Sequence, residues 1–156
     1  MTDEISSASE PTSDEKTMAT LAHALQVVGG WIAPLVIFLL RRNSRFVSFH
    51  ALQVLLLELI WMVVAGIMVM VWVVFFFSTI FMAAATHPHS APPPALFFLF
   101  FPLIWGGFML LWLGKLVIAI VYALKAGRGE WADYPLLGSF ARRILKIPRY
   151  ATISQS

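Results

Sequence analysis

Glu58 is the most unusual side chain in this sequence, because it is the only charged residue between Arg45 and Lys115. An ionisable group at the centre of a bilayer costs roughly 2.5–3.5 kcal/mol on insertion scales, so a carboxylate there needs a partner or a role. Lys115 lies at a similar expected depth in a later apolar run, which predicts an ion pair between two helices. In a second arrangement Lys115 reaches the head groups and Glu58 bonds to nearby polar groups. The functional alternative is a relay for protons or ions, or a polar groove for a passing peptide.

His50 and Gln53 are polar residues near the start of the same apolar run. A histidine titrates near pH 6.5 and is therefore a candidate sensor or relay. On an ideal helix His50 and Gln53 share a face, while Glu58 lies about 80° away and two turns further on. Direct contact between His50 and Glu58 within one helix is therefore not expected. We interpret His50 and Gln53 as interfacial residues that bond to the backbone or to lipid head groups.

Three histidines are weak candidates for a metal site. His87 and His89 form an H-P-H motif, and His23 is expected near the same side of the membrane. Imidazoles bind zinc and copper, but no carboxylate or second histidine-rich motif accompanies these three. The sequence therefore predicts neither a metal nor a cofactor.

Basic residues stand at the ends of apolar runs, where they fix topology and contact lipid phosphates. No nucleotide-binding loop, zinc-protease motif or nucleophile elbow is present. We therefore expect the protein not to be an enzyme. The basic residues assigned to head groups and topology are Arg41, Arg42, Arg45, Arg142, Arg143 and Lys146.

The composition indicates an integral membrane protein. Of the 156 residues, 60% are hydrophobic and 12% are charged, against about 45–50% and about 25% in soluble domains. A soluble chain this short could not bury so much apolar surface. The absence of cysteine excludes disulfides and thiolate metal sites. The net charge of +3 is confined to the ends of apolar runs, so no nucleic-acid partner is expected.

The first apolar run covers residues 18–40 and follows an acidic tail, residues 1–17, that we expect to be disordered. Its 23 residues are long enough to span a bilayer, which takes about 20. Gly29–Gly30 and Pro34 predict a kink there. We expect one kinked span, and the alternatives are a re-entrant hairpin or two half-helices.

Two longer runs follow, at about residues 51–82 and 96–124, separated by an outer proline-rich loop at 83–95. An isolated spanning segment must satisfy its own backbone hydrogen bonds, so both runs are expected to be helices. The fold class is therefore an all-α polytopic membrane protein, with a transmembrane domain at residues 18–125 and three spans.

Residues 126–156 are expected to form a connector, a helix and a tail in the cytoplasm. Pro135 is suited to the first turn of a helix. Apolar residues then recur at helical spacing beside the basic ones, which predicts an amphipathic helix on an anionic membrane surface. With three spans, the positive-inside rule places the N-terminus outside and the C-terminus in the cytoplasm. The apolar residues of this helix are Leu136, Leu137, Phe140, Ile144 and Leu145.

Two stretches resemble a bacterial membrane-protein family of unknown function. They are LAHALQVVGGWIAPLVIFLLRRNSRFVSFHALQVLLLELI and VYALKAGRGEWADYPLLGSFARR. That family is similar, more distantly, to the Tic-like channel component of the chloroplast inner-envelope protein-import machinery. The resemblance implies a bacterial inner-membrane location but carries no catalytic or ligand residues. The matching positions are His23, Pro34, Arg45, Phe46, His50, Gln53, Gly129, Glu130, Tyr134, Pro135 and Gly138.

Two functional classes follow from these observations. The first is a non-enzymatic structural or assembly subunit of a membrane complex. The second is a transport or protein-translocation component with a polar path lined by His50, Gln53, Glu58 and Lys115. Three spans cannot enclose a wide pore, so both classes predict homo-oligomers or other membrane proteins as partners, within the lipid bilayer.

Overall fold

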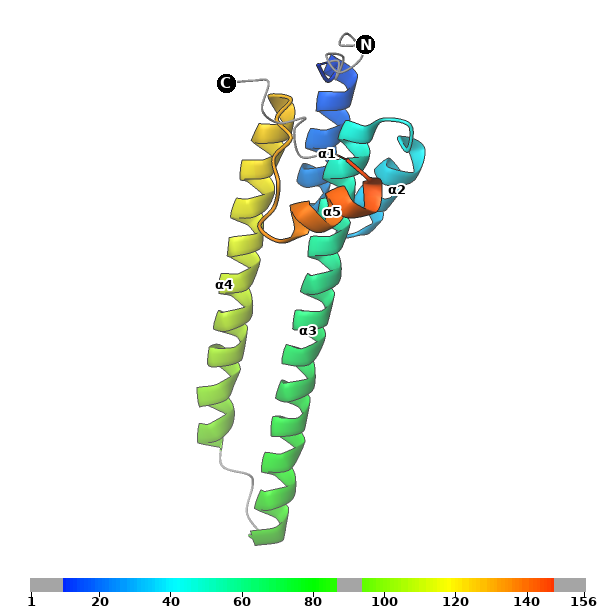
Figure 1. Ribbon diagram of the computed structural model, residues 1–156. Coiled ribbons are helices and arrows are strands. Elements are labelled where there is room, and N and C mark those ends of the chain that lie inside the picture. Colours follow the sequence, from blue (N-terminus) through cyan, green and yellow to red (C-terminus); the bar gives the residue numbers. More distant parts are fainter. Residues whose placement is uncertain (1–9, 87–93, 148–156) are drawn as a thin grey trace. The chain divides into compact units, whose positions relative to one another are not determined.

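The computed structural model describes residues 10–86 and 94–147. Within these ranges the regular structure is entirely α-helical (Figure 1), which confirms the all-α prediction. The chain divides into two compact units. The terminal unit comprises residues 1–59 and 116–156, and the central unit comprises residues 60–115. The helices are α1 (Ser13–Gly29), α2 (Ile32–Leu40), α3 (Arg45–Thr86), α4 (Pro94–Gly127) and α5 (Leu137–Leu145).

The first apolar run forms α1 and α2, which pack against each other, rather than the single kinked span that we expected. The break lies at Gly30, whose φ of 53° ends α1. Pro34 does not kink a helix, because it lies in the first turn of α2, where backbone N–H groups have no partner within the helix. Each helix is shorter than the roughly 20 residues that cross a bilayer. The prediction of a third span is therefore not confirmed.

The start of α1 also differs from the expected tail. A capping box at Thr12 and Glu15 begins the helix at Ser13, so residues 13–17 are helical. Glu15 accepts a hydrogen bond from the Thr12 backbone N–H at 2.8 Å, and a second from the Ser44 hydroxyl at 2.6 Å. The box therefore ties the beginning of α1 to the residue that precedes α3.

Two helices are long and apolar enough to cross a membrane. They are Arg45–Ala85 of α3 and Phe100–Gly127 of α4, with mean hydropathies of 2.7 and 2.1 in their most apolar windows. Those windows are 0% and 11% buried inside the protein, so neither helix resembles the core of a soluble domain. A continuous apolar surface of this size needs lipid or another protein to cover it. Both helices extend into the predicted loop at 83–95, of which residues 87–93 lie outside the described ranges.

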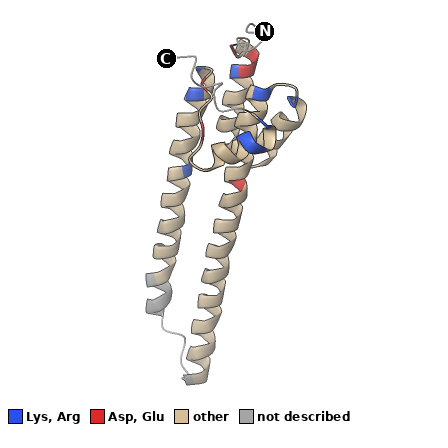
Figure 2. Ribbon diagram, in the orientation of Figure 1, with Lys and Arg blue, Asp and Glu red and all other residues tan. Residues whose placement is uncertain are grey.

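In the central unit α3 and α4 meet through aromatic side chains. The ring centroids of Phe75 and Phe100 are 4.0 Å apart, and those of Trp61 and Phe108 are 5.2 Å apart. Lys115 is the only charged residue of this unit, and its Nζ lies 5.3 Å from the Trp61 ring centroid. All other Lys, Arg, Asp and Glu residues belong to the terminal unit (Figure 2).

The terminal unit packs α1, the start of α3, the end of α4 and α5 through small residues. Ala19 of α1 and Ala126 of α4 contact Phe46 of α3, and all three are buried. Thr20 of α1 donates a hydrogen bond to the Ala123 carbonyl of α4 at 3.3 Å. This close packing creates a buried interior in which polar side chains must find protein partners.

Candidate functional site

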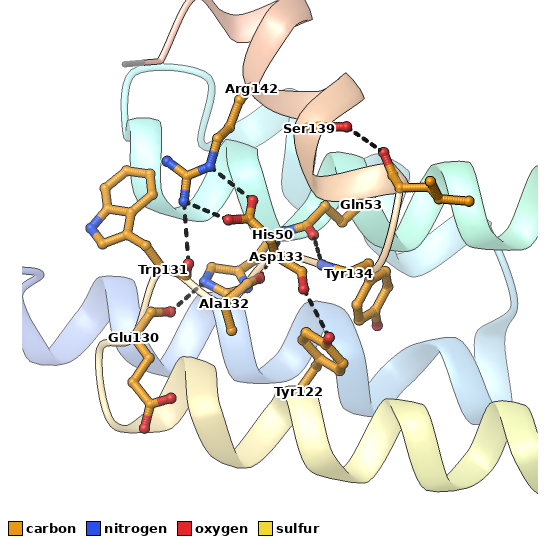
Figure 3. A network of polar contacts seen from close by, with 11 residues as sticks. His50, Gln53, Tyr122, Glu130, Trp131, Ala132, Asp133, Tyr134, Ser139 and Arg142 are labelled. Atoms are coloured by element: carbon orange, nitrogen blue, oxygen red, sulfur yellow. Dashed lines mark hydrogen bonds and ion pairs between the residues drawn. The ribbon is translucent and has the colours of Figure 1, made fainter. Parts of the chain in front are cut away.

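The candidate site is a buried polar network that fixes the connector between α4 and α5 against α3 (Figure 3). Gln53 of α3 bonds the connector twice. Its Nε2 donates to the Ala132 carbonyl at 3.2 Å, and its Oε1 accepts from the Tyr134 backbone N–H at 2.6 Å. Gln53 is 0% exposed. One amide side chain therefore satisfies two backbone groups of a segment that has no regular secondary structure.

A chain of histidines extends this network from the connector to α1. His50 Nε2 lies 3.0 Å from the Glu130 carbonyl, His50 Nδ1 lies 3.0 Å from His23 Nε2, and His23 Nδ1 lies 2.9 Å from the Tyr134 hydroxyl. A carbonyl can only accept, so His50 carries its proton on Nε2 and accepts on Nδ1. His23 then donates from Nε2, and Tyr134 donates to His23 Nδ1. Every hydrogen bond in the chain has a donor and an acceptor when both rings are neutral.

Burial keeps the site uncharged at His23 and Tyr134. His23 is 0% exposed and Tyr134 is 2% exposed. Burial, reinforced by the neighbouring His50, holds the pKa of His23 well below its usual 6.5. Burial raises the pKa of the Tyr134 hydroxyl above its usual range. Both groups are therefore neutral at pH 7, as the hydrogen-bond directions require.

Arg142 of α5 is buried in this site rather than placed among lipid head groups, which corrects our expectation for it. Its Nε and Nη2 donate to the two carboxylate oxygens of Asp133, at 2.8 and 3.1 Å, and Nη2 also donates to the Trp131 carbonyl at 3.2 Å. The guanidinium lies 4.7 Å from the Phe49 ring centroid, and Arg142 is 4% exposed. A buried guanidinium needs such a bidentate partner. Arg143 and Lys146, in contrast, are exposed.

Two glycines allow the connector to fold this closely. Gly129 has a φ of 84°, and a Cβ added there would come 2.7 Å from Lys16 Cε. A Cβ on Gly138 would collide with the Asp133 side chain. Tyr122 of α4 completes the site by donating from its hydroxyl to the Asp133 carbonyl at 2.8 Å. The connector thus has contacts with four helices.

The other predicted site residues lie in different surroundings. Glu58 is 2% exposed in the terminal unit, whereas Lys115 belongs to the central unit, so their pairing stays a prediction. Arg41 forms an ion pair with Asp14 at 2.8 Å, and Arg42 and Arg45 are exposed.

The predicted weak metal candidates are not brought together in the described part of the chain. There, no group of three His, Cys, Asp or Glu side chains is placed to hold a metal ion. His23 has His50 and Tyr134 as its neighbours. His87 and His89 lie outside the described residues.

The sequence reasoning did not assign roles to Asp133, Tyr134, Tyr122 or Gln26. Gln26 is 1% exposed in α1, one turn from His23. For Tyr134, as for Gly129 and Gly138, a signal existed, because these positions matched the motifs of the resembling family. Asp133, Tyr134 and Tyr122 are hydrogen-bonded within the network, which holds the connector in place, whereas the buried amide of Gln26 has no hydrogen-bond partner among the described residues.

Comparison with known proteins gives one family. Residues 14–141 match the model of the magnetosome magnetite crystal formation protein family, and this match runs from α1 into α5 across both units. No curated protein and no solved structure matches the chain.

Proposed function

The chain belongs to the magnetosome magnetite crystal formation protein family, a bacterial membrane family, and from this premise we propose that it is a non-enzymatic assembly subunit of the magnetosome membrane. In this role the two long helices hold the protein in the bilayer, and the terminal unit offers a fixed surface to other components. The expected similarity to the chloroplast import component stays a prediction.

The closed polar network is the observation that carries this proposal. A transport path would need His50 and Gln53 to face water or a substrate. Both are 0% exposed, and their side chains are bonded to His23, to the connector backbone, or to both. Side chains occupied in this way favour a structural role over a polar path.

The charge distribution supports a defined orientation. With two spans, both ends of the chain lie on one side of the membrane. Of the 11 Lys and Arg residues, only Lys115 lies outside the terminal unit. The positive-inside rule therefore places the terminal unit, including the N-terminus, in the cytoplasm. This orientation replaces the outside N-terminus that three spans required.

The same orientation limits contact with a growing crystal. The sequence between Thr86 and Pro94 would face the magnetosome lumen, and it contains no Asp, Glu, Lys or Arg, while His87 and His89 are its titratable side chains. The stretch thus offers no carboxylate side chain to iron at a mineral surface, and its two imidazoles are its metal-binding side chains. We therefore propose that the protein acts on crystal formation mainly through the membrane and its protein partners.

Single-cysteine labelling tests the orientation, because the chain has no cysteine of its own. Cysteines are placed at Ser7, Asn43, Ser90 and Ser154 and exposed to an impermeant thiol reagent, in intact magnetosomes and after opening them. In isolated magnetosomes the cytoplasmic face is outside. We expect labelling of positions 7, 43 and 154 in intact vesicles, and labelling of position 90 only after opening. Opposite sides for positions 7 and 43 would instead indicate a third span.

Complementation tests the role. The gene carrying both His50→Ala and Gln53→Ala is returned to a magnetite-forming bacterium that lacks its own copy. We expect abnormal magnetite crystals by electron microscopy, together with loss of partner proteins from affinity-purified complexes. The exposed substitution Ser139→Ala is the control. Normal crystals from the double variant at normal abundance would contradict the proposal.

The transport alternative depends on Glu58, a carboxylate 2% exposed in a helix that is a candidate span. A Glu58→Gln variant at normal abundance that no longer passes ions or peptides would favour transport. Reduced abundance alone would favour the structural role.

A further inference from the structure

Helix α5 has an exposed apolar edge that no described part of the protein covers. Leu136, Phe140 and Ile144 are 88%, 49% and 50% exposed. Phe140 and Ile144 are four residues apart within α5, so they share one side of the helix, and Leu136 is the residue immediately before its first turn. Leu136 has a φ of 67°, a conformation that residues other than glycine rarely adopt. The most exposed side chain of this edge is thus held in a strained backbone position.

Arg142 determines which way this edge points. It is two residues from both Phe140 and Ile144, a rotation of about 200° around a helix, so it lies on the opposite side of α5. Arg142 is directed into the network, toward Asp133 and the Phe49 ring. The ion pair therefore fixes the rotation of α5 and keeps the apolar edge away from the network.

The packing of α5 determines which turns of α3 it contacts. Ala141 of α5 belongs to a core with Phe49 and Ile147, against which Leu52, Leu56 and Leu145 pack. Phe49 to Leu56 lie in the early turns of α3 beside the polar residues His50 and Gln53, and the uninterrupted apolar stretch of α3 begins after Glu58. Figure 1 shows that α5 runs across α3 rather than along it. A helix that crosses the early turns of α3 is suited to lie along the surface of a membrane that α3 spans.

We propose that α5 lies in the surface of the same membrane that α3 and α4 span, with its apolar edge among lipid acyl chains and Arg143 and Lys146 at anionic head groups. This inference rests on the membrane placement in the proposed function. Charge complementarity identifies the occupant, because Arg143 and Lys146 are both exposed while the nearby acid, Asp133, is paired with Arg142. Apolar residues bordered by basic ones are typical of helices that bind an anionic interface.

The test uses the full chain in nanodiscs that contain phosphatidylglycerol and phosphatidylcholine. A fluorophore is attached to Phe140→Cys or, as a matched control, to the adjacent exposed residue through Ser139→Cys. We expect a nitroxide on the lipid acyl chain to quench the label at position 140 about threefold more strongly than the label at 139. Iodide dissolved in the water should quench the label at position 139 more strongly than the label at position 140.

Equal iodide quenching at both positions would overturn the proposal, because the edge would then face water. Shielding of position 140 from iodide without quenching by the nitroxide lipid would also overturn it, because protein, such as a second copy, would then cover the edge. The cysteine labelling described above tests the two spans separately. Correct spans with an unquenched position 140 would therefore refute this inference and leave the proposed function intact.

A second arm tests the head-group contacts. The label at position 140 lies either among the acyl chains or in the water. Arg143→Gln combined with Lys146→Gln should lower the ratio of the first population to the second about fivefold per charge removed. Arg128→Gln, which removes an exposed positive charge outside α5, should leave the ratio unchanged. The double variant should behave in anionic nanodiscs as the parent does in pure phosphatidylcholine. No change in the double variant would refute the role of anionic lipid.

Discussion

The direction of each hydrogen bond in the histidine chain is set at its far end, by the Glu130 carbonyl. His50 must donate to it, and His23 must in turn donate to His50. Tyr134 then donates to His23, and no imidazole nitrogen of the two rings is left to accept a further proton without breaking a bond. At the scale of single residues, the site is therefore organised for neutral histidines and is sensitive to acid.

This sensitivity gives a pH prediction. The pKa of His23 is well below 6.5 in the folded protein and near 6.5 in the unfolded chain. Below pH 6.5 the unfolded state therefore binds more protons, and the free energy of unfolding falls as the pH falls. The slope for one group is at most about 1.4 kcal/mol per pH unit. We expect a lower Tm at pH 5.5 than at pH 7.5 for the purified protein in nanodiscs.

His23→Gln is the matched control for this prediction, since an amide can replace one donor and one acceptor but does not titrate in this range. Its Tm is expected to be lower at pH 7.5 and to change less between pH 7.5 and 5.5. An equally steep pH dependence in His23→Gln would show that another group is responsible.

Gln53 gives a second prediction at this scale. Gln53→Ala leaves the Tyr134 N–H and the Ala132 carbonyl without their side-chain partner in a buried site. Each of the two unsatisfied groups costs about 1–3 kcal/mol, so we expect a loss of roughly 2–6 kcal/mol in the free energy of unfolding. Denaturant unfolding followed by tryptophan fluorescence measures this loss. Ser139→Ala, which removes one exposed hydrogen bond, should change stability by no more than about 0.5 kcal/mol.

At the scale of elements, the positions of the connector and of α5 depend on each other. The connector has no regular secondary structure, so its position depends on the side chains that α3, α4 and α5 direct at it. Arg142 provides the link from α5. Without that link, the contacts that hold α5 in the described part of the chain are those of its small apolar core with Phe49.

Arg142→Gln is therefore expected to release α5. It removes the bidentate contact to Asp133 and leaves the Trp131 carbonyl with a weaker donor. Backbone amides of Leu137–Leu145 should exchange with deuterium at least about tenfold faster, while those of α1 change little. In nanodiscs of pure phosphatidylcholine, where Arg143 has no anionic lipid to contact, Arg143→Gln should leave the exchange unchanged. Equal protection in both variants would show that the ion pair does not hold α5.

Gly138 provides a steric test of the same element. A Cβ at this position would collide with Asp133, so Gly138→Ala must displace the connector or the start of α5. We expect a lower Tm and faster exchange in residues 130–140. Gly66→Ala is the control, because a Cβ there has no atom within 4 Å and alanine favours the helix. A Gly138→Ala variant as stable as Gly66→Ala would mean that the close approach is not required.

At the scale of the whole molecule, insertion into the membrane and assembly of the polar network depend on different parts of the chain. The hydropathy of α3 and α4 drives insertion, whereas the network belongs to the terminal unit. A chain with a disrupted network should therefore still enter the bilayer. This separation is consistent with a membrane anchor that carries a folded terminal unit.

The double variant His50→Ala/Gln53→Ala tests the separation. We expect it to stay in the membrane pellet after carbonate extraction, even though its terminal unit is destabilised. The contrasting variant carries Val69→Arg and Val73→Arg in α3, each of which costs about 2.5–3.5 kcal/mol at the centre of a span. That variant should be lost from the pellet. Extraction of the network variant by carbonate would show that insertion depends on the terminal unit.

Local properties of the sequence were enough to predict the class of the fold. Composition and hydropathy identified a membrane protein, and the need to satisfy backbone hydrogen bonds in lipid made its long apolar runs helical. The glycine pair at Gly29–Gly30 marked the place where the first run breaks. These features depend on neighbouring residues only, so an isolated sequence can reveal them.

Contacts between distant residues decided the rest. A run of 23 apolar residues is long enough to span a bilayer or to fold back as two helices, and packing of α1 on α2 selected the second form. His23 and His50 are 27 positions apart, and Gln53 and Tyr134 are 81 apart. Helical periodicity showed which residues share a face but not which segment covers it. The sequence therefore predicted that Arg142 contacts lipid head groups. The tertiary structure instead places Asp133 beside its guanidinium, and the sequence pattern did not show this contact.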